Sequence, residues 1–158
     1  MLVLLVRHGH AGAKRVWHGE DGFRPLDREG LAQAEGLVPL LTPFEPSRIV
    51  SSPLLRCLQT VTPLSEALGI PIERSQSLLP EAGKAATLLA RTVESEGPGA
   101  VVLCTHGEVI HEMQAQFAHK GLPGFSPASS REKGSVWVLT RTDGRFTEAR
   151  YVAPKTPG

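Results

Sequence analysis

The amino-acid sequence predicts an α/β protein: a three-layer α/β/α sandwich with a mostly parallel central sheet and a C-terminal hairpin. Residues 2–6 and 101–104 are continuous apolar runs, the pattern of parallel strands that are covered on both faces. Segments with helical spacing of apolar residues lie between the two runs, as expected for alternating strands and helices. Close to the C-terminus, Asp143-Gly144 separates two strand-like segments and predicts a tight hairpin turn.

The predicted strands follow in chain order. The first, residues 2–6, is shorter than the apolar core of a signal peptide and is followed at once by charged residues. Short strands are expected at Ile49-Val50 and at Ile70-Pro71-Ile72. The C-terminal hairpin should pair residues 136–140 with residues 146–152, which can make one edge of the sheet antiparallel.

The helices are predicted from the residues that typically start and end them. Asp27 is an N-cap candidate for the first helix, and Pro39 should kink or end it. Ser52-Pro53 is expected to start the second helix, which Pro63 should bend or divide and Gly69 should end. Two more helices are expected, from about residue 81 or 82 to residue 96 and from residue 107 to about residue 119.

Length and charge restrict the function. The 158 residues fit one domain, expected over residues 1–153 with a loose tail over 154–158. The net charge of +1 gives no general attraction to a nucleic acid polymer or an anionic membrane. No run approaches the roughly 18 to 20 apolar residues that span a bilayer. Of the two cysteines, Cys57 and Cys104, the second lies in an apolar run typical of a buried thiol, which favours a cytoplasmic protein.

Polar residues that phosphate chemistry uses follow both apolar runs. Arg7-His8-Gly9 comes directly after the first run, and Thr105-His106-Gly107 comes after the second. In a parallel sheet the functional crevice lies at the carboxyl ends of the strands, so His8 and His106 are expected to face each other there. Burying a cation and an imidazole is costly unless they bind something in that crevice.

Arg56 is expected in the first turn of the second helix. Its guanidinium can there reach an anion near the positive end of the helix dipole. A guanidinium supplies two directed donors and a permanent charge, which suits recognition of a phosphate. A neutral imidazole such as that of His8 is a competent nucleophile for phosphorus.

Three segments together resemble the histidine phosphatase superfamily, also called the phosphoglycerate mutase-like superfamily. They are Leu5-Val6-Arg7-His8-Gly9, the segment from Ser51-Ser52-Pro53 to Arg56 with Gln59-Thr60, and Thr105-His106-Gly107. The spacing of Arg24-Pro25-Leu26-Asp27, Gly30 and Gln33-Ala34-Glu35 is similar to the compact SixA-type phosphohistidine phosphatases. It is also similar to the histidine phosphatase domains appended to some bacterial Nudix (MutT-type) hydrolases. The resemblance covers roughly residues 2 to 140.

The resemblance implies a phosphatase with a covalent phosphohistidine intermediate. His8 would be the nucleophile, and Arg7, Arg56 and His106 would surround the transferred phosphoryl group. These groups would offset its charge without a metal or other cofactor. The expected substrate is a phosphorylated small molecule, a nucleotide or a phosphoprotein.

The proton donor for the leaving group is less evident from the sequence. Glu81 follows Leu78-Leu79-Pro80 at a predicted strand-to-helix transition, a region where family members often carry an acidic residue. The alternative is that Glu81 is a solvated acid in the first turn of a helix. Glu20 and Asp21, in the loop after the first strand, are further candidates.

Several residues near the first loop have open roles. His10 stands where many mutase relatives carry Glu, Gln or a small polar residue, which argues against mutase activity, as does the short chain. Three roles are open for His10: it contacts the substrate, it adjusts the properties of His8, or it has no specific role. Lys14 and Arg15 could contact substrate together with His18 and Arg24, although an exposed loop of mixed charge is the alternative; Trp17 either covers the pocket or packs in the loop.

Three other functions are compatible with parts of this pattern. A SixA-type protein phosphohistidine phosphatase is a narrower version of the same activity. A module that recognises phosphate without turnover would keep the same pocket. A zinc hydrolase could use His8, His10, His106 and His111, but Arg7 and Arg56 would repel the ion and no HExxH pattern occurs.

Overall fold

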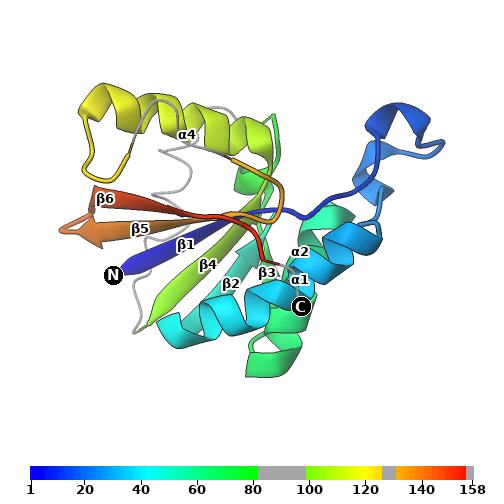
Figure 1. The fold of residues 1–158 in the computed structure, drawn as a ribbon, viewed down its shortest axis with the longest axis horizontal. Helices are drawn as coiled ribbons and strands as arrows, with labels where there is room; N and C mark the ends of the chain where they lie inside the picture. Colours follow the sequence, from blue (N-terminus) through cyan, green and yellow to red (C-terminus); the bar gives the residue numbers. More distant parts are fainter. Residues whose placement is uncertain (82–98, 126–130, 156–158) are drawn as a thin grey trace.

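The computed structural model describes residues 1–81, 99–125 and 131–155, which contain one six-stranded sheet with the order β3-β2-β4-β1-β5-β6 (Figure 1). The strands are β1 Leu2–Arg7, β2 Pro46–Ser51, β3 Ile72–Arg74, β4 Ala100–Thr105, β5 Val136–Thr142 and β6 Arg145–Val152. The neighbours from β3 to β1 pair in parallel. β5 and β6 are antiparallel, so the predicted mostly parallel sheet with a terminal hairpin is confirmed.

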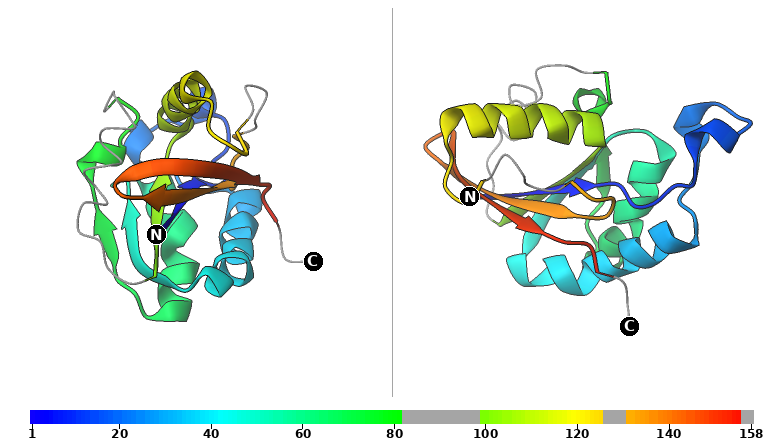
Figure 2. Two further views of the ribbon diagram at one scale, coloured as in Figure 1. Left: turned by 90° about the vertical axis from the view of Figure 1, so that its left-hand side faces the viewer. Right: turned by 45° about the horizontal axis from the view of Figure 1, so that its top comes forward.

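Helices cover both faces of the sheet (Figures 1 and 2). They are α1 Arg28–Leu41, α2 Leu55–Leu68 and α4 Gly107–Lys120. Alternate residues of β1 point to opposite faces: Leu4 packs in the cluster that contains residues of α1 and α2, and Leu5 packs in the cluster that contains residues of α4. The three-layer prediction is confirmed. None of the described helices is long and apolar enough to cross a membrane.

The turn of the hairpin forms where the sequence predicts it. Asp143 and Gly144 both adopt positive φ, 51° and 76°, which is the conformation that a tight turn between two twisted strands requires. The first helix also starts as predicted, because the Asp27 side chain accepts a hydrogen bond from the Gly30 backbone nitrogen.

Two predictions about the helices are corrected. α1 continues through Pro39 to Leu41, whose side chain is fully buried, and a 3-10 turn over Thr42–Phe44 follows. α2 begins at Leu55 rather than at Pro53, and its N-cap residue has no side-chain cap. The Ser52 hydroxyl is instead within hydrogen-bond distance of His106, so it is engaged in the site rather than in a conventional cap.

Pro63 does not divide α2, which is continuous from Leu55 to the predicted stop at Gly69. Val61 and Leu64 on either side of the proline are fully buried, and this burial offsets the hydrogen bond that proline cannot donate. The helix predicted from residue 81 or 82 to residue 96 lies outside the described residues, except for Glu81, which is in a turn. Of the predicted tail, only Pro154 and Lys155 are described.

The parallel strands end together at one edge of the sheet. Arg7 of β1 is in register with Thr105 of β4, and Ser51 of β2 is in register with Cys104. The residues that follow these strand ends are therefore neighbours. From the same edge, the chain after β1 extends away from the sheet through two 3-10 turns, η1 Lys14–Val16 and η2 Asp21–Phe23 (Figure 1).

Candidate active site

The two histidines that follow β1 and β4 meet at this edge, as predicted. The ring centroids of His8 and His106 lie 5.3 Å apart, with the ring planes at 61°. Both residues are buried, and the His8 backbone nitrogen donates to the Thr105 carbonyl oxygen at 3.1 Å. The pairing of β1 with β4 thus fixes the distance between the two imidazoles.

His8 is held in one tautomer. Its Nδ1 lies 2.8 Å from the Gly9 carbonyl oxygen, which can only accept, so this nitrogen carries the hydrogen. The lone pair of the neutral ring is therefore on Nε2. The backbone around His8 is also fixed, because the Gly9 nitrogen donates to the Thr60 hydroxyl oxygen at 2.9 Å and that hydroxyl donates to the Arg56 carbonyl at 2.6 Å.

His106 is held by its other nitrogen. Its Nε2 lies 2.8 Å from the Ser52 Oγ, and the Leu54 backbone nitrogen donates to the same oxygen at 3.3 Å. The Ser52 hydroxyl accepts from Leu54 and can donate its own hydrogen to Nε2; we assign this direction, which places the ring hydrogen of His106 on Nδ1. That Nδ1 is buried and has no hydrogen-bond partner among the described residues.

A cavity of about 150 Å³ lies beside the two histidines. Five cationic side chains and two carboxylates are among its lining residues, a net charge of +3 with both histidines neutral. The full lining is Arg7, His8, Lys14, Asp21, Arg24, Arg56, His106, Gly107, Glu108 and Lys133. A small, strongly positive cavity of this kind suits an anion.

Three residues that line this cavity each carry a buried nitrogen that has no partner within the described part of the chain: Arg7 Nε, Arg56 Nε and His106 Nδ1. A buried donor without an acceptor costs about 1–3 kcal/mol, so three of them in one cavity indicate a missing acceptor. They come from β1, α2 and the start of α4, three elements that only the fold brings together.

Arg7 packs against the start of α4. A Cβ at Gly107 would lie 2.9 Å from the Arg7 Cζ, so only glycine leaves room for the guanidinium at this helix N-terminus. Arg7 Nη1 donates to the Arg131 carbonyl oxygen, which orients the group. Burial, and then the charge of Arg131, lower the pKa of Arg7, the signature of a cation held where an anion would stabilise it.

Both histidines are neutral at physiological pH. Burial, together with the smaller effects of the charges of Arg56, Arg7 and Lys133, lowers the pKa of His8 to about 3, although the bond to Gly9 opposes this shift. Burial also lowers the pKa of His106 to about 3, with smaller contributions from His8 and Arg56. A neutral His8 keeps the Nε2 lone pair that a nucleophile needs.

Asp21 enters the cavity from the loop after β1. Its carboxylate accepts from Arg24 Nε at 3.0 Å and from Arg56 Nη2 at 3.1 Å, and its carbonyl accepts from Arg56 Nη1 at 2.9 Å. Desolvation raises the pKa of Asp21, but the bond to Arg24 and the charges of Arg56, Arg24 and Lys14 outweigh it, and the net shift is downward. Asp21 is therefore ionised at neutral pH.

Of the three other predicted site residues Lys14, Arg15 and Glu81, only Lys14 lines the cavity. Arg15, in the same turn as Lys14, is exposed and is not among the lining residues. Glu81 is exposed in the turn after Pro80 and is not a lining residue either. Its role stays a prediction, since the residues that follow it are outside the described ranges.

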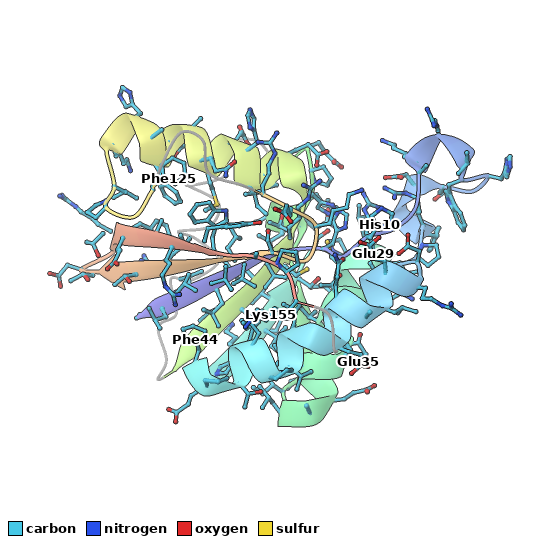
Figure 3. All side chains as sticks on the ribbon, in the orientation of Figure 1. His10, Glu29, Glu35, Phe44, Phe125 and Lys155 are labelled. Atoms are coloured by element: carbon cyan, nitrogen blue, oxygen red, sulfur yellow. The ribbon has the colours of Figure 1, made fainter. Side chains whose placement is uncertain are left out.

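His10 turns away from the cavity toward the start of α1. Its Nδ1 is bonded to Asp27 Oδ2 and lies 3.8 Å from Glu29 Oε2. Figure 3 shows His10 and Glu29 near each other at this end of the helix. Both line a separate open cavity of about 410 Å³, which Lys133 also lines. The structure thus gives His10 a contact with the first helix and no contact with His8.

Sequence reasoning missed Lys133, Glu108 and the part that Ser52 plays in the site. Lys133 lies in the loop before β5 and lines the cavity, and burial together with the charges of Arg7 and Arg24 lowers its pKa. No local pattern marks Lys133. The contact of Ser52 with His106 was also missed, although its position directly after a buried strand was the signal that could have indicated it.

The zinc alternative gains no support from the described residues. Among residues 1–81, 99–125 and 131–155, no group of three or more His, Cys, Asp or Glu side chains could hold a metal ion. His10 is engaged with Asp27, and the basic side chains around His8 and His106 create a positive environment that disfavours a cation.

Comparisons with known proteins agree with this geometry. Residues 3–80 match the model of the histidine phosphatase superfamily (branch 1). The chain is 38% identical over 155 residues to a protein of Mycolicibacterium smegmatis named 8-oxo-(d)GTP phosphatase. That alignment covers 96% of this chain and 48% of the relative, so the chain spans about half of that relative's length.

Solved structures share the fold. The protein histidine phosphatase SixA, in complex with tungstate, superposes with a TM-score of 0.72 at 23% identity and covers 99% of this chain and 97% of its own. A mycobacterial glucosyl-3-phosphoglycerate phosphatase superposes with a TM-score of 0.70 at 21% identity, with 99% of each chain covered. With the buried His8, His106, Arg7 and Arg56 around one positive cavity, these findings lead to one conclusion: the chain belongs to the histidine phosphatase superfamily.

Proposed function

We propose that the chain is a metal-independent phosphatase that hydrolyses its substrate through a covalent phosphohistidine on His8. The observation that supports this proposal most is that Arg7, Arg56 and His106, each with a buried nitrogen that has no partner among the described residues, line one cavity with the neutral His8. A phosphoryl group has three nonbridging oxygens that could accept these bonds. Its negative charge would also match the net positive charge of the cavity.

In the first step, the Nε2 lone pair of His8 attacks phosphorus. A nitrogen–phosphorus bond forms as the bond from phosphorus to the leaving group breaks, and the leaving group takes the electron pair. The donors on Arg7, Arg56 and His106 stabilise charge on the nonbridging oxygens in the transition state. The bond from His8 Nδ1 to the Gly9 carbonyl stabilises the positive charge that the ring acquires.

In the second step, water attacks the phosphorus of phosphohistidine. The new oxygen–phosphorus bond forms as the nitrogen–phosphorus bond breaks, which returns the lone pair to His8 Nε2 and releases inorganic phosphate. The proton that water loses passes to solvent or to the phosphate itself. The cycle requires no metal, and activity should therefore persist in EDTA and be blocked by vanadate, an analogue of the transferred group.

The substrate class we propose is a phosphorylated small molecule, with a nucleotide as the first candidate. The name of the relative with 38% identity supports a nucleotide. A SixA-type phosphohistidine phosphatase is the second candidate, supported by the fact that Glu81 is not a lining residue. A nitrogen leaving group would depart with less help from an acid than an alkoxide would.

We also propose a cytoplasmic location and a single domain over residues 1–153. The two cysteines, Cys57 and Cys104, are free and buried, which agrees with a reducing compartment. One continuous sheet from β3 to β6 supports the single domain. A phosphate-recognition module without turnover is the weaker reading, because nucleophile and donors are all present.

A phosphatase screen with phosphopeptides, sugar phosphates and nucleotides tests the proposal, with His8→Ala as the control. We expect release of inorganic phosphate by the wild type from at least one class and none from His8→Ala. The wild-type protein should also acquire a covalently bound phosphoryl group that is labile in acid and stable in alkali, as expected for phosphohistidine. Equal turnover by His8→Ala would refute the covalent mechanism, and anion binding without any turnover would indicate a recognition module.

A further inference from the structure

We call the cavity of about 150 Å³ that His8 and His106 line the phosphate cavity. Another cavity, distinct from the one lined by His10, lies next to it and has a different chemistry. It encloses about 210 Å³ and its walls are mainly apolar. The lining residues are Ala11, Gly12, Ala13, Val16, Trp17, Arg24, Pro25, Leu26 and Asp27. We call it the Trp17 cavity. Among its lining side chains, Val16 and Trp17 are large hydrophobics that remain 63% and 39% exposed, an arrangement that leaves apolar surface for a ligand.

The Trp17 ring is held in place without a bound molecule. Its Nε1 donates to the Glu20 carbonyl oxygen at 2.9 Å. A Cβ at Gly19 would lie 3.1 Å from the same nitrogen, so the glycine backbone packs closely on the edge of the ring. These contacts satisfy the only polar atom of the indole and leave its flat surface fixed and partly open.

The Trp17 cavity and the phosphate cavity share a wall. Arg24 lines both of them. Its Nη1 donates to the Ala11 carbonyl at 2.8 Å on the side of the Trp17 cavity, while its Nε donates to Asp21 on the side of the phosphate cavity. The short turn η1 also contributes a residue to each cavity: Lys14 lines the phosphate cavity and Val16 lines the Trp17 cavity.

We propose that the Trp17 cavity binds the base of a nucleoside di- or triphosphate whose terminal phosphoryl group lies against His8. This inference rests on the proposed function. A flat apolar ring pocket next to a cationic cavity matches a molecule with an aromatic base at one end and phosphates at the other. Lys14 and Arg24, which lie between the two ends, would contact the phosphate adjoining the terminal one.

The charges of the phosphate cavity agree with this substrate class. Its net charge of +3 exceeds what one phosphoryl dianion would balance, and a second phosphate supplies the remainder. Attack of His8 Nε2 on the terminal phosphorus breaks its bond to the bridging oxygen, which keeps the electron pair as part of a nucleoside phosphate. That anion is stable without a strong acid, so the ionised Asp21 is compatible with the step.

The test compares a substrate that has a base with one that lacks it. Phosphate release from guanosine diphosphate and from inorganic pyrophosphate is measured for the wild type, Trp17→Ala, Trp17→Phe and Phe23→Ala. We expect Trp17→Ala to raise KM for guanosine diphosphate by about 5- to 100-fold and to leave pyrophosphate turnover unchanged. Trp17→Phe should restore most of the loss. Phe23, an exposed aromatic of the same loop that lines neither cavity, is the matched control.

Binding provides a readout that does not depend on turnover. In a His8→Ala background, guanosine diphosphate should quench the fluorescence of Trp17 and pyrophosphate should not, whereas Trp137 is buried and serves as the constant background. The inference is overturned if Trp17→Ala affects both substrates equally, or if guanosine diphosphate is neither bound nor hydrolysed while other phosphoesters are. Absence of all turnover and of a His8 label would instead refute the proposed function itself.

Discussion

His8 at the end of β1 and His106 at the end of β4 follow neighbouring parallel strands, and a glycine comes after each of them. Their rings nevertheless have different partners. The backbone carbonyl of Gly9 binds Nδ1 of His8, whereas the hydroxyl of Ser52 binds Nε2 of His106. His8 therefore keeps a lone pair on Nε2, and His106 keeps a donor on Nδ1.

This difference shows that the same dipeptide at the same kind of strand end can supply two opposite functions. The nitrogen that is bonded to a fixed partner determines what the other nitrogen can do. One ring suits attack on phosphorus, and the other suits stabilisation of the oxygens around it.

The largest effect is expected from replacing the nucleophile. His8→Gln keeps a polar side chain of similar reach but has no imidazole, so it should form no phosphoryl-enzyme and show no turnover. Rapid-quench labelling with a substrate labelled at the transferred phosphate measures this directly. If His8→Gln still formed a phosphoryl-enzyme and His106→Gln formed none, His106 would be the nucleophile and this assignment would be wrong.

Loss of one donor should be severe but incomplete. Arg7→Ala, Arg56→Ala and His106→Gln are each expected to lower kcat by about 100- to 1,000-fold, because each removes one preorganised donor to the transition state. Steady-state phosphate release measures the loss, and Arg15→Ala, an exposed arginine outside the cavity lining, should retain full activity. Turnover within about twofold of the wild type in all three variants would exclude this role.

Burial of two neutral histidines should make the fold sensitive to acid. Their pKa values of about 3 in the folded protein lie below the unfolded value, so the unfolded chain binds protons first as pH falls below 6.5. Stability should decrease between pH 6.5 and about 3 by up to about 1.4 kcal/mol per pH unit for each histidine. Urea unfolding at several pH values measures this slope, which His8→Gln should reduce. An identical slope in the variant would contradict the burial of a neutral His8.

The smallest effect is expected from the residue that orients His106. Ser52→Ala removes the partner of Nε2, so His106 should populate both tautomers and kcat should decrease by about 5- to 10-fold, the value of one hydrogen bond. Nitrogen chemical shifts of the ring, measured by NMR, would report the mixed tautomers, which a purely structural role would not cause. Ser65→Ala, whose hydroxyl bonds to Ile70 away from the site, is the matched control.

The core of the site could be predicted because its members follow clear local signals. His8 and His106 come directly after continuous apolar strands, and Arg56 lies in the first turn of α2 as expected. Asp21, which the sequence offered as a further candidate for the proton donor, lies in the turn η2, and Lys133, which was missed, lies in the loop before β5. The approach of both to the cavity depends on contacts with residues distant in sequence. The tautomers could not be predicted either, since they depend on two oxygens whose positions only the folded chain defines.

The same distinction explains the fold. The layers, the mostly parallel sheet and the terminal hairpin could be predicted from continuous apolar runs and from Asp143-Gly144, which are local patterns, whereas the order of the strands was not predicted. The start of α2 could not be predicted, because the Ser52 hydroxyl contacts His106, a long-range partner. Pro39 and Pro63 lie inside helices because burial of their neighbours outweighs the local cost.

The central claim is that phosphorus becomes bonded to Nε2 of His8 during turnover. Quenching the reaction in alkali, digesting the protein and locating the phosphoryl group by mass spectrometry tests it most directly. We expect one acid-labile phosphoryl group on the peptide that contains His8, absent in His8→Gln and present in Ser52→Ala. A phosphoryl group on another residue, or turnover in His8→Gln, would contradict the account.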